Sequence, residues 1–194
     1  VEYHALDVRD VVALGALVRG VKSRLGRVDL VVHGAGVLED KRLSEKTPES
    51  FRRVFDTKVN SAQALVDAAP DAAFVFFSSI AGAFGNAGQV DYAAANSALD
   101  ALAGRLNAEG RRAVSIAWGP WGGGGMVSPE LEREYARRGM GLIAPTVGAD
   151  AFLNEVALLL SGGPAHVVLM NADAALFAWG AEPESPAAGG AIAG

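Results

Sequence analysis

Short apolar runs alternate with longer segments of helical period along most of the chain. The apolar runs predict strands near Val1–Leu6, Val28–His33, Ala73–Ser78, Ala113–Trp118 and His166–Leu169. The runs around Leu30 and Phe76 carry apolar residues at consecutive positions, which is typical of strands covered on both faces. This alternation predicts the α/β class, with a parallel sheet and helices on both of its faces.

The segments between these runs contain helix-start and linker signals. Thr47 is a favourable N-cap before Pro48, so a helix is expected over residues 49–68. A second helix is expected to carry Tyr92 and to run to about residue 109. From Ala181 to Gly194 the chain is rich in Ala, Gly, Pro and Glu and has no period. We therefore predict one folded domain, residues 1–180, followed by a flexible linker, residues 181–194.

Composition excludes several classes of function. The chain has 194 residues, 51% of them hydrophobic, and a net charge of -5 with no basic stripe, which argues against nucleic-acid binding. It contains no cysteine, and its three histidines lie far apart, so no metal site is predicted. The chain contains no apolar run of about 18 residues, the length that a helix needs to span a bilayer. We expect a soluble, cytoplasmic protein without membrane contact.

Candidate chemistry gathers around two hydroxyl groups. Ser79 closes the predicted strand, and Tyr92 follows thirteen residues later near a helix start, with Asn96 one turn further along the same face. In open α/β sheets the ligand crevice lies beyond the carboxyl ends of the strands, where Ser79 and Tyr92 can converge. Together they can hold and protonate one carbonyl oxygen. Taken singly, such a serine is more often a turn residue and such a tyrosine a core residue.

Lys58 falls on the apolar stripe of the helix over residues 49–68, three and four residues after Phe55 and Val54. One interpretation is that its stem covers apolar surface while the ammonium reaches water. The other is electrostatic, because a cation near Tyr92 would lower the pKa of the phenol from about 10 towards the working pH. A tyrosine with a lowered pKa is a better general acid.

Two loops leave the strands through small residues. The Gly34-Ala35-Gly36 turn would let a ligand approach the backbone closely, although such a turn is more often a tight strand exit. The segment from Trp118 to Gly125 contains Pro120 and ends in four glycines, which suggests a mobile lid. The alternative is a surface loop whose tryptophans are packing anchors.

In combination these residues resemble the catalytic half of a ketoreductase domain of a modular or iterative polyketide synthase. The resemblance covers Val1 to about Leu176 and rests on four motifs. They are Lys58, Phe77-Ser78-Ser79-x-Ala81-Gly82, Gly88-Gln89-x-x-Tyr92-Ala93-Ala94-Ala95-Asn96 and Ala117-Trp118-Gly119-Pro120-Trp121. The family belongs to the short-chain dehydrogenase/reductase superfamily, whose sheet is Rossmann-like. The Gly85-Asn86-Ala87-Gly88-Gln89 stretch is most similar to polyunsaturated-fatty-acid and enediyne-type synthases.

The resemblance implies NADPH-dependent reduction of a β-ketoacyl group carried on the phosphopantetheine arm of an acyl carrier protein. Tyr92 would supply the proton, Ser79 would hold the substrate oxygen and Asn96 would order a proton relay. Lys58 would tune Tyr92 and touch the cofactor ribose. Free short-chain dehydrogenases carry a lysine four residues after the tyrosine, where this chain has Asn96, which is the synthase arrangement.

The resemblance also implies residues that contact the cofactor. Asp7 and the adjacent Val8 match the adenine-contacting position. The Gly34-Ala35-Gly36 backbone and Pro120 would line the nicotinamide side, with Lys58 and Tyr92 completing the cofactor site.

Further residues are implied to orient the substrate. Leu38-Glu39-Asp40 resembles the Leu-Asp-Asp signature of ketoreductases that give the D-configured alcohol, with Glu39 departing from it. Phe84 stands where the opposite class has tryptophan. Gln89 belongs to the same substrate-facing stretch.

One expected part is missing. The chain contains no Gly-x-Gly-x-x-Gly loop opening a helix, so it lacks the N-terminal glycine-rich strand-helix unit that binds the cofactor pyrophosphate. In the family's sheet order, the strand expected at Val1–Leu6 would be separated from Val28–His33 by two absent strands, leaving a gap. The N-terminal part of the domain and other synthase domains are therefore expected partners. A non-catalytic scaffold subdomain and a free-standing dehydrogenase stay open as alternatives.

Overall fold

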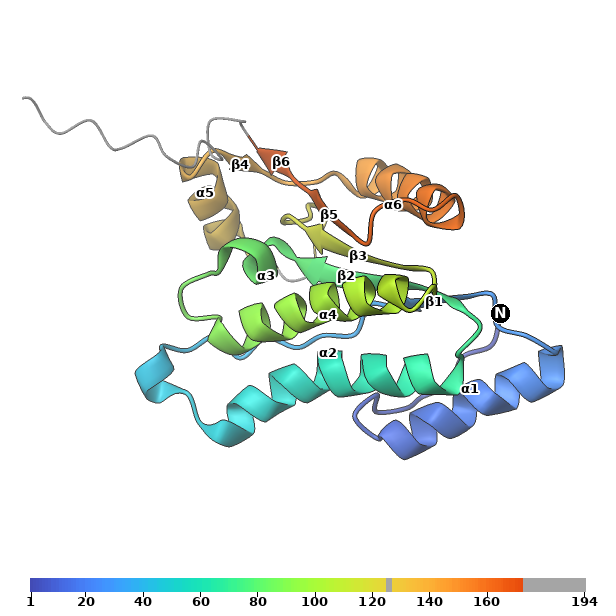
Figure 1. Cartoon of the computed structure of the whole chain (residues 1–194). Helices are drawn as coiled ribbons and strands as arrows, with labels where there is room; N and C mark the ends of the chain where they lie inside the picture. The colour runs from blue at the N-terminus through green and yellow to red at the C-terminus, as the bar shows by residue number, and fades with distance from the viewer. Residues whose placement is uncertain (125–126, 173–194) are drawn as a thin grey trace, which may run out of the picture.

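The computed structural model describes residues 1–124 and 127–172 of the chain. Its centre is a parallel sheet of strands β1 (Leu30–His33), β2 (Ala73–Ser79), β3 (Ala113–Trp118) and β5 (His166–Leu169), in the order β1-β2-β3-β5. Helices α1 (Val11–Leu25), α2 (Pro48–Ala68) and α4 (Val90–Ala108) lie on one side of the sheet, and α6 (Pro145–Leu160) lies on the other (Figure 1). The predicted α/β class is confirmed.

The smaller elements lie near the carboxyl ends of the strands. The short helix α3 (Ile80–Phe84) follows β2 directly, and the 3-10 turn η1 (Leu43–Glu45) precedes α2. Helix α5 (Pro129–Arg137) leads into β4 (Met140–Gly141), which pairs with β6 (Asn171–Ala172) in a separate antiparallel ribbon. These elements surround the end of the sheet at which ligands bind in open α/β folds.

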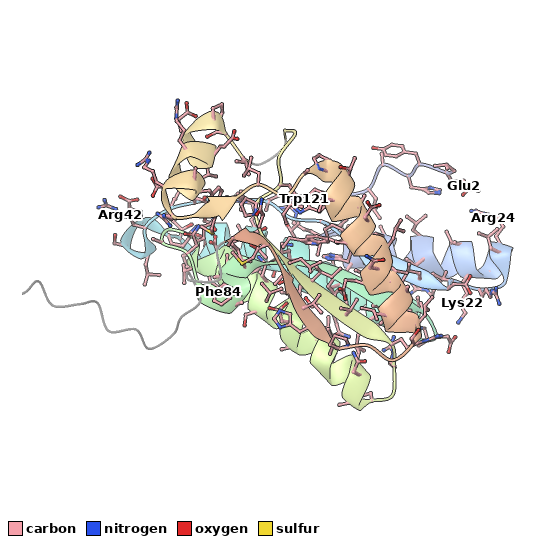
Figure 2. The ribbon with its side chains drawn as sticks, turned by 90° about the horizontal axis from the view of Figure 1, so that it is seen from above. Glu2, Lys22, Arg24, Arg42, Phe84 and Trp121 are labelled. Carbon is pink, nitrogen blue, oxygen red and sulfur yellow. The ribbon has the colours of Figure 1, made fainter. Side chains whose placement is uncertain are left out.

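A second apolar layer joins the sheet to α6. Val75, Ile116 and Leu159 are buried together there, with Phe152 packed against them. The Trp121 side chain lies beside the first turns of α6 (Figure 2), where a methyl group on Gly148 would overlap its ring. This layer fixes the loop that follows β3 against the sheet.

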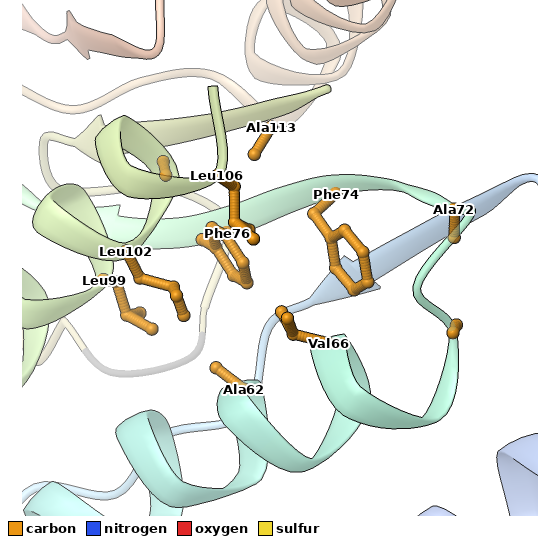
Figure 3. Close-up of a cluster of buried hydrophobic side chains, with 11 residues drawn as sticks. Ala62, Val66, Ala72, Phe74, Phe76, Leu99, Leu102, Leu106 and Ala113 are labelled. Carbon is orange, nitrogen blue, oxygen red and sulfur yellow. The ribbon is translucent and has the colours of Figure 1, made fainter. Parts of the chain in front are cut away.

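The main core lies between β2 and the helices of the other face. Phe74 and Phe76 stack with ring centroids 5.8 Å apart and point between α2 and α4 (Figure 3). Both rings are fully buried, as is Leu99 on α4. Because β2 is covered on both faces, its apolar run is continuous, which is the pattern that predicted it.

Helix α2 begins as its sequence predicts. The Thr47 side chain accepts a hydrogen bond from the Ser50 backbone N–H at 3.2 Å, and Pro48 occupies the first turn, where no amide donor is needed. The helix ends at Ala68, the predicted boundary. Its inward face carries Val54, Lys58 and Ala62, so the residues that share the apolar stripe in sequence are buried together.

The predicted strand at Val1–Leu6 is wrong. This segment has no regular structure and is exposed, with Tyr3 at 90% exposure. A strand needs a neighbour with which to form a hydrogen-bond ladder, and no described strand pairs with this segment. The predicted gap is wrong as well, because the four parallel strands form one continuous sheet with β1 at its edge.

Some expectations concern parts of the chain that the structure does not describe. The domain boundary at residue 180 and the linker 181–194 lie outside the described residues, as does Gly125 in the glycine run. No helix within residues 1–124 and 127–172 is long and apolar enough to cross a membrane. Over the same ranges, no cluster of three or more His, Cys, Asp or Glu side chains could hold a metal ion.

Candidate active site

A cleft of about 430 Å³ opens at the carboxyl ends of β2 and β3. We call it the central cleft. It is lined by Gly34, Gly36, Leu38, Asp40, Lys58, Phe77, Ser78, Ser79, Ile80, Gln89, Tyr92, Trp118, Gly119, Pro120, Trp121, Gly124, Val127, Leu131 and Tyr135. The candidate residues Lys58, Ser79 and Tyr92 come from three different elements and share this one cleft.

Ser79 ends β2 in register with Trp118 of β3. Its side chain also caps α3, because Oγ accepts a hydrogen bond from the Ala81 backbone N–H at 3.2 Å. Ser79 is therefore a turn residue and a cleft residue at once. Capping uses the oxygen as an acceptor and leaves the hydroxyl proton as a donor towards the Tyr92 phenol and the cleft.

Close packing of α3 on α4 places Tyr92 beside Ser79. A Cβ on Gly82 would lie 2.9 Å from both Cβ of Asn96 and the backbone nitrogen of Ser97, so only glycine allows the helices to approach this closely. Asn96 is fully buried, and its Nδ2 donates to the Tyr92 backbone oxygen at 2.8 Å. Its Oδ1 has no hydrogen-bond partner among the described residues, which leaves an acceptor beside the tyrosine.

The pKa of the Tyr92 phenol is shifted in the direction opposite to the one expected from the sequence. Burial raises its pKa, and hydrogen bonds with the Ser79 and Asn96 side chains offset part of that rise. The predicted lowering of the Tyr92 pKa is wrong for this structure, because desolvation outweighs the interactions that favour the phenolate. Tyr92 is thus protonated at neutral pH, which is the form that a proton donor requires.

Lys58 faces inward, and the interpretation that its ammonium reaches water is wrong. Only 3% of the residue is exposed, and Nζ donates to the Phe77 carbonyl oxygen at 2.8 Å. Nζ also lies 5.5 Å from the centroid of the Tyr92 ring, within cation-π range. Burial lowers the pKa of Lys58 to about 8, opposed by the Asp100 carboxylate.

His33, at the end of β1, was not a candidate from the sequence. It is buried, and its Nε2 lies 2.7 Å from Ser61 Oγ. Burial, reinforced by the positive charge of Lys58, lowers the pKa of His33 to about 4. His33 is therefore neutral at pH 7 and adds no second positive charge beside Lys58.

The small residues after β1 allow close approach to Lys58. Gly34 and Gly36 line the central cleft, whereas Ala35 between them does not. A Cβ on Gly36 would lie 3.1 Å from Lys58 Cε, tighter than most side-chain contacts. Pro120 lines the cleft after β3. Lys58 Nζ carries three donor hydrogens and gives one of them to a backbone carbonyl, so this side of the cleft fits the hydroxyl-bearing ribose of a nicotinamide cofactor.

Asp7 and Val8 lie in the turn before α1 and line neither cleft of the described residues. Arg9 forms an ion pair with Asp7, with Nη2 and Oδ2 2.7 Å apart, and both side chains are about half exposed. Hydrogen bonds from Arg9 hold the pKa of Asp7 at about 2. In this structure the Asp7 carboxylate is paired with Arg9 and does not line the cleft that contains Lys58 and Tyr92.

The side chains of Leu38, Glu39 and Asp40 divide between two directions. Leu38 and Asp40 line the central cleft, and Gln89 Nε2 donates to Asp40 Oδ2 at 2.8 Å. Glu39 does not line it. Ser50 Oγ donates to Glu39 at 2.6 Å and Arg53 Nη2 donates at 2.9 Å, so its carboxylate anchors the loop to α2.

A second cleft of about 330 Å³, which we call the side cleft, opens between α3 and α5 and includes Phe84 in its lining. Both clefts are lined by Ser79, Ile80, Gln89 and Tyr135, so the two meet at the candidate serine. Tyr135 was missed by the sequence reasoning. The feature of the sequence that could have identified it is the spacing of Leu131 and Tyr135. The two residues lie four positions apart on a helix rich in charged residues, so they share one face, and both line the central cleft.

The tryptophans after β3 are packing anchors. The Trp118 and Trp121 rings meet edge to face with centroids 4.9 Å apart, and Trp118 also contacts Phe77 at 5.5 Å. Trp121 forms an isolated parallel bridge with Ile143. These contacts support the alternative that the aromatic residues fix the loop, while the predicted mobility of its glycines stays a prediction.

Comparison with known proteins defines the class. A sequence model of the KR domain family matches residues 1–123, more than half of the chain. The chain therefore belongs to this family, the ketoreductase domains of polyketide synthases within the short-chain dehydrogenase/reductase superfamily. The predicted membership and Rossmann-like fold are confirmed.

Individual relatives place the chain among large synthases. It is 38% identical over 173 residues to a polyunsaturated fatty acid synthase protein of Thraustochytrium sp., covering 87% of this chain and 6% of that protein. It is 40% identical over 177 residues to erythronolide synthase EryA3 of Saccharopolyspora erythraea, covering 91% and 5%. The ketoreductase PlmKR1 from the first module of phoslactomycin biosynthesis in Streptomyces sp. HK803 superposes with a TM-score of 0.81 at 40% identity. That match covers 89% of this chain and 40% of the PlmKR1 chain.

Proposed function

We propose that this chain is the catalytic part of a reductase that converts a β-ketoacyl group into a β-hydroxyacyl group. The observation that carries the proposal is the meeting of Lys58, Ser79 and Tyr92 in one cleft at the carboxyl ends of β2 and β3. A structural subdomain without catalytic work has no physical need to bury an ammonium group beside a phenol, because desolvating a charge costs free energy.

The residues of the cleft have separate roles in the proposed reaction. Ser79, with its proton available, donates a hydrogen bond to the ketone oxygen of the substrate. Tyr92, which is protonated at neutral pH, gives its phenolic proton to the same oxygen as negative charge develops there. The positive charge of Lys58 stabilises the resulting phenolate. The unpartnered Oδ1 of Asn96 is a hydrogen-bond acceptor that can order the relay by which a proton returns to Tyr92.

The proposed cofactor is NADPH, held on its nicotinamide-ribose side by Lys58, Tyr92, Pro120 and the Gly34–Gly36 backbone. When bound, it supplies the hydride that reduces the ketone carbon. The choice of NADPH over NADH comes from the family and is part of the proposal. We also propose that the substrate arrives on the phosphopantetheine arm of an acyl carrier protein and that other synthase domains are partners, because the named relatives are large synthases.

The direct test uses the full-length reductase domain, by which we mean this chain together with the N-terminal glycine-rich part that the family resemblance implies. A simple β-ketoacyl thioester is supplied with NADPH, and consumption of NADPH is followed by its absorbance. We expect oxidation of NADPH that depends on the thioester and is slower with NADH. A domain that folds yet oxidises neither cofactor would refute the proposal.

The 194-residue chain alone is expected to bind NADPH weakly or not at all. It has the residues for the ribose side but no glycine-rich loop opening a helix, so the cofactor phosphates lack their usual backbone donors. Isothermal titration calorimetry compares the chain with the full-length domain. Equally tight binding to both would mean that another loop of this chain holds the phosphates.

The product is expected to be the D-3-hydroxyacyl thioester. Leu38 and Asp40 face the central cleft, whereas Glu39, the residue that departs from the family signature, is tied to Ser50 and Arg53 on α2. Chiral chromatography of the released product tests this. A hundredfold preference requires about 2.7 kcal/mol between the two bound poses, which a few side chains can supply. A predominantly L product would show that Glu39 changes the outcome.

A further inference from the structure

A buried ion pair lies beside the candidate proton donor. Lys46 Nζ is 2.7 Å from Asp91 Oδ2, and the two side chains are 3% and 1% exposed. Asp91 is the residue immediately before Tyr92, and its Oδ1 accepts a hydrogen bond from the Tyr92 backbone N–H at 2.9 Å. Lys46 also donates to the Glu39 carbonyl oxygen. Through two side chains, the Leu38–Asp40 loop is thus connected to the backbone of Tyr92.

Two further contacts join the same two segments. The Lys41 backbone N–H donates to the Gly88 carbonyl oxygen at 2.9 Å, and Gln89 Nε2 donates to Asp40 Oδ2 at 2.8 Å. Both are nearer to solvent than the ion pair. The loop after β1 is therefore held against the turn before α4 along its length, with the ion pair as its buried contact.

The burial of this pair calls for an explanation other than stability. Removing two charges from water costs about as much as their attraction returns, so apolar residues of similar volume would often stabilise a protein equally well. An ion pair adds geometric specificity, because a charged hydrogen bond fixes the positions of both partners. By contrast, the Lys22–Asp71 pair has the same distance of 2.7 Å at the surface, where its side chains are 37% and 81% exposed.

We infer that the buried Lys46–Asp91 ion pair positions the Leu38–Asp40 loop relative to Tyr92 and thereby sets which face of the ketone is reduced. This inference rests on the proposed function for its second half. Lys46 and Asp91 line neither cleft, so they act through Leu38, Asp40 and Tyr92 and are positioning residues. Their loss should change the selectivity of the reaction more than its chemistry.

The test variant replaces both partners, Lys46→Met with Asp91→Asn. It leaves no unpaired buried charge, and the side-chain amide oxygen introduced by Asp91→Asn can still accept from the Tyr92 N–H. The matched control is Lys22→Met with Asp71→Asn, which removes the same residue types at the opposite end of the molecule from Phe84 (Figure 2). If the double variant does not fold, Lys46→Gln with Asp91→Asn, which also leaves no buried charge and keeps a polar group on each side chain, serves as the second variant.

The first measurement is amide hydrogen exchange in the 194-residue chain, which does not depend on any activity. We expect the hydrogen-bonded amides of Lys41, Glu45 and Lys46 to exchange at least tenfold faster in the test variant, while β2 and the control variant are unchanged. Exchange of these three amides at the wild-type rate would overturn the inference.

The second measurement is the ratio of the two alcohol enantiomers made by the full-length domain from a β-ketoacyl thioester. We expect the ratio to move at least tenfold towards the minor enantiomer in the test variant and less than twofold in the control. Faster loop exchange with an unchanged ratio would also overturn the inference. If the wild-type domain makes no alcohol, the proposed function and the stereochemical half of the inference fail, while the exchange data still decide whether the pair holds the loop.

Discussion

Replacing Tyr92 with phenylalanine in the full-length domain is expected to lower the rate of ketone reduction by about a hundredfold to ten-thousandfold. The substitution removes one oxygen from a half-buried ring that lines the cleft and leaves the rest of the ring in place, so the fold is retained. What is lost is the proton that Tyr92 delivers to the substrate oxygen beside Ser79. The measurement is the initial rate of thioester-dependent NADPH oxidation.

The control for this prediction is Tyr3→Phe, which removes the same hydroxyl group from a residue that is 90% exposed and lines neither cleft. It should react at the wild-type rate. Circular dichroism and the thermal midpoint should agree between both variants and wild type. A Tyr92→Phe domain that reduces the thioester at the wild-type rate would remove Tyr92 from its proposed role and favour a scaffold function.

Replacing Lys58 with methionine is expected to abolish most of the reductase activity while stabilising the chain. Methionine is similarly long and unbranched, so it preserves the packing of α2, but it cannot stabilise a phenolate at Tyr92. In the wild type, the activity that depends on the charge of Lys58 should fall as the pH rises past about 8, where that ammonium loses its proton. The residual activity of the variant should lack this decline.

The stabilisation follows from the direction of the pKa shift. Burial lowers the pKa of Lys58 from 10.5 to about 8, so the unfolded chain binds this proton more tightly and the charge disfavours folding at neutral pH. Wild-type stability should therefore rise between pH 8 and pH 10.5. Below pH 8 the Lys58→Met chain should be more stable by about 1 to 3 kcal/mol, and the difference should vanish above pH 10.5.

Urea unfolding of the chain at several pH values measures this difference, with Lys22→Met as the control because Lys22 pairs with Asp71 at the surface. The control should change stability by less than about 1 kcal/mol at any pH. A Lys58→Met domain with wild-type activity and an unchanged pH profile would show that the buried ammonium serves packing alone. Loss of activity together with loss of stability would point to misfolding instead.

The sequence by itself determined the strands of the sheet centre and identified three of the residues that face the cleft, Lys58, Ser79 and Tyr92. Apolar runs at Phe74–Phe77 and Ala113–Trp118 predict buried strands, because strands covered on both faces are apolar at nearly every position. The spacing of Tyr92 and Asn96, and the place of Lys58 on an apolar stripe, follow from the helix period. These are local properties, and each of them is present in a few neighbouring residues.

The tertiary structure alone decided features that depend on distant parts of the chain. Val1–Leu6 has the composition of a strand but forms none, because a strand requires a paired neighbour and no described strand provides one. The direction of the Tyr92 pKa shift depends on how completely its surroundings exclude water, which no local pattern encodes. Lys46 and Asp91 are 45 residues apart, so only the packing of the loop against α4 shows that they form a buried pair.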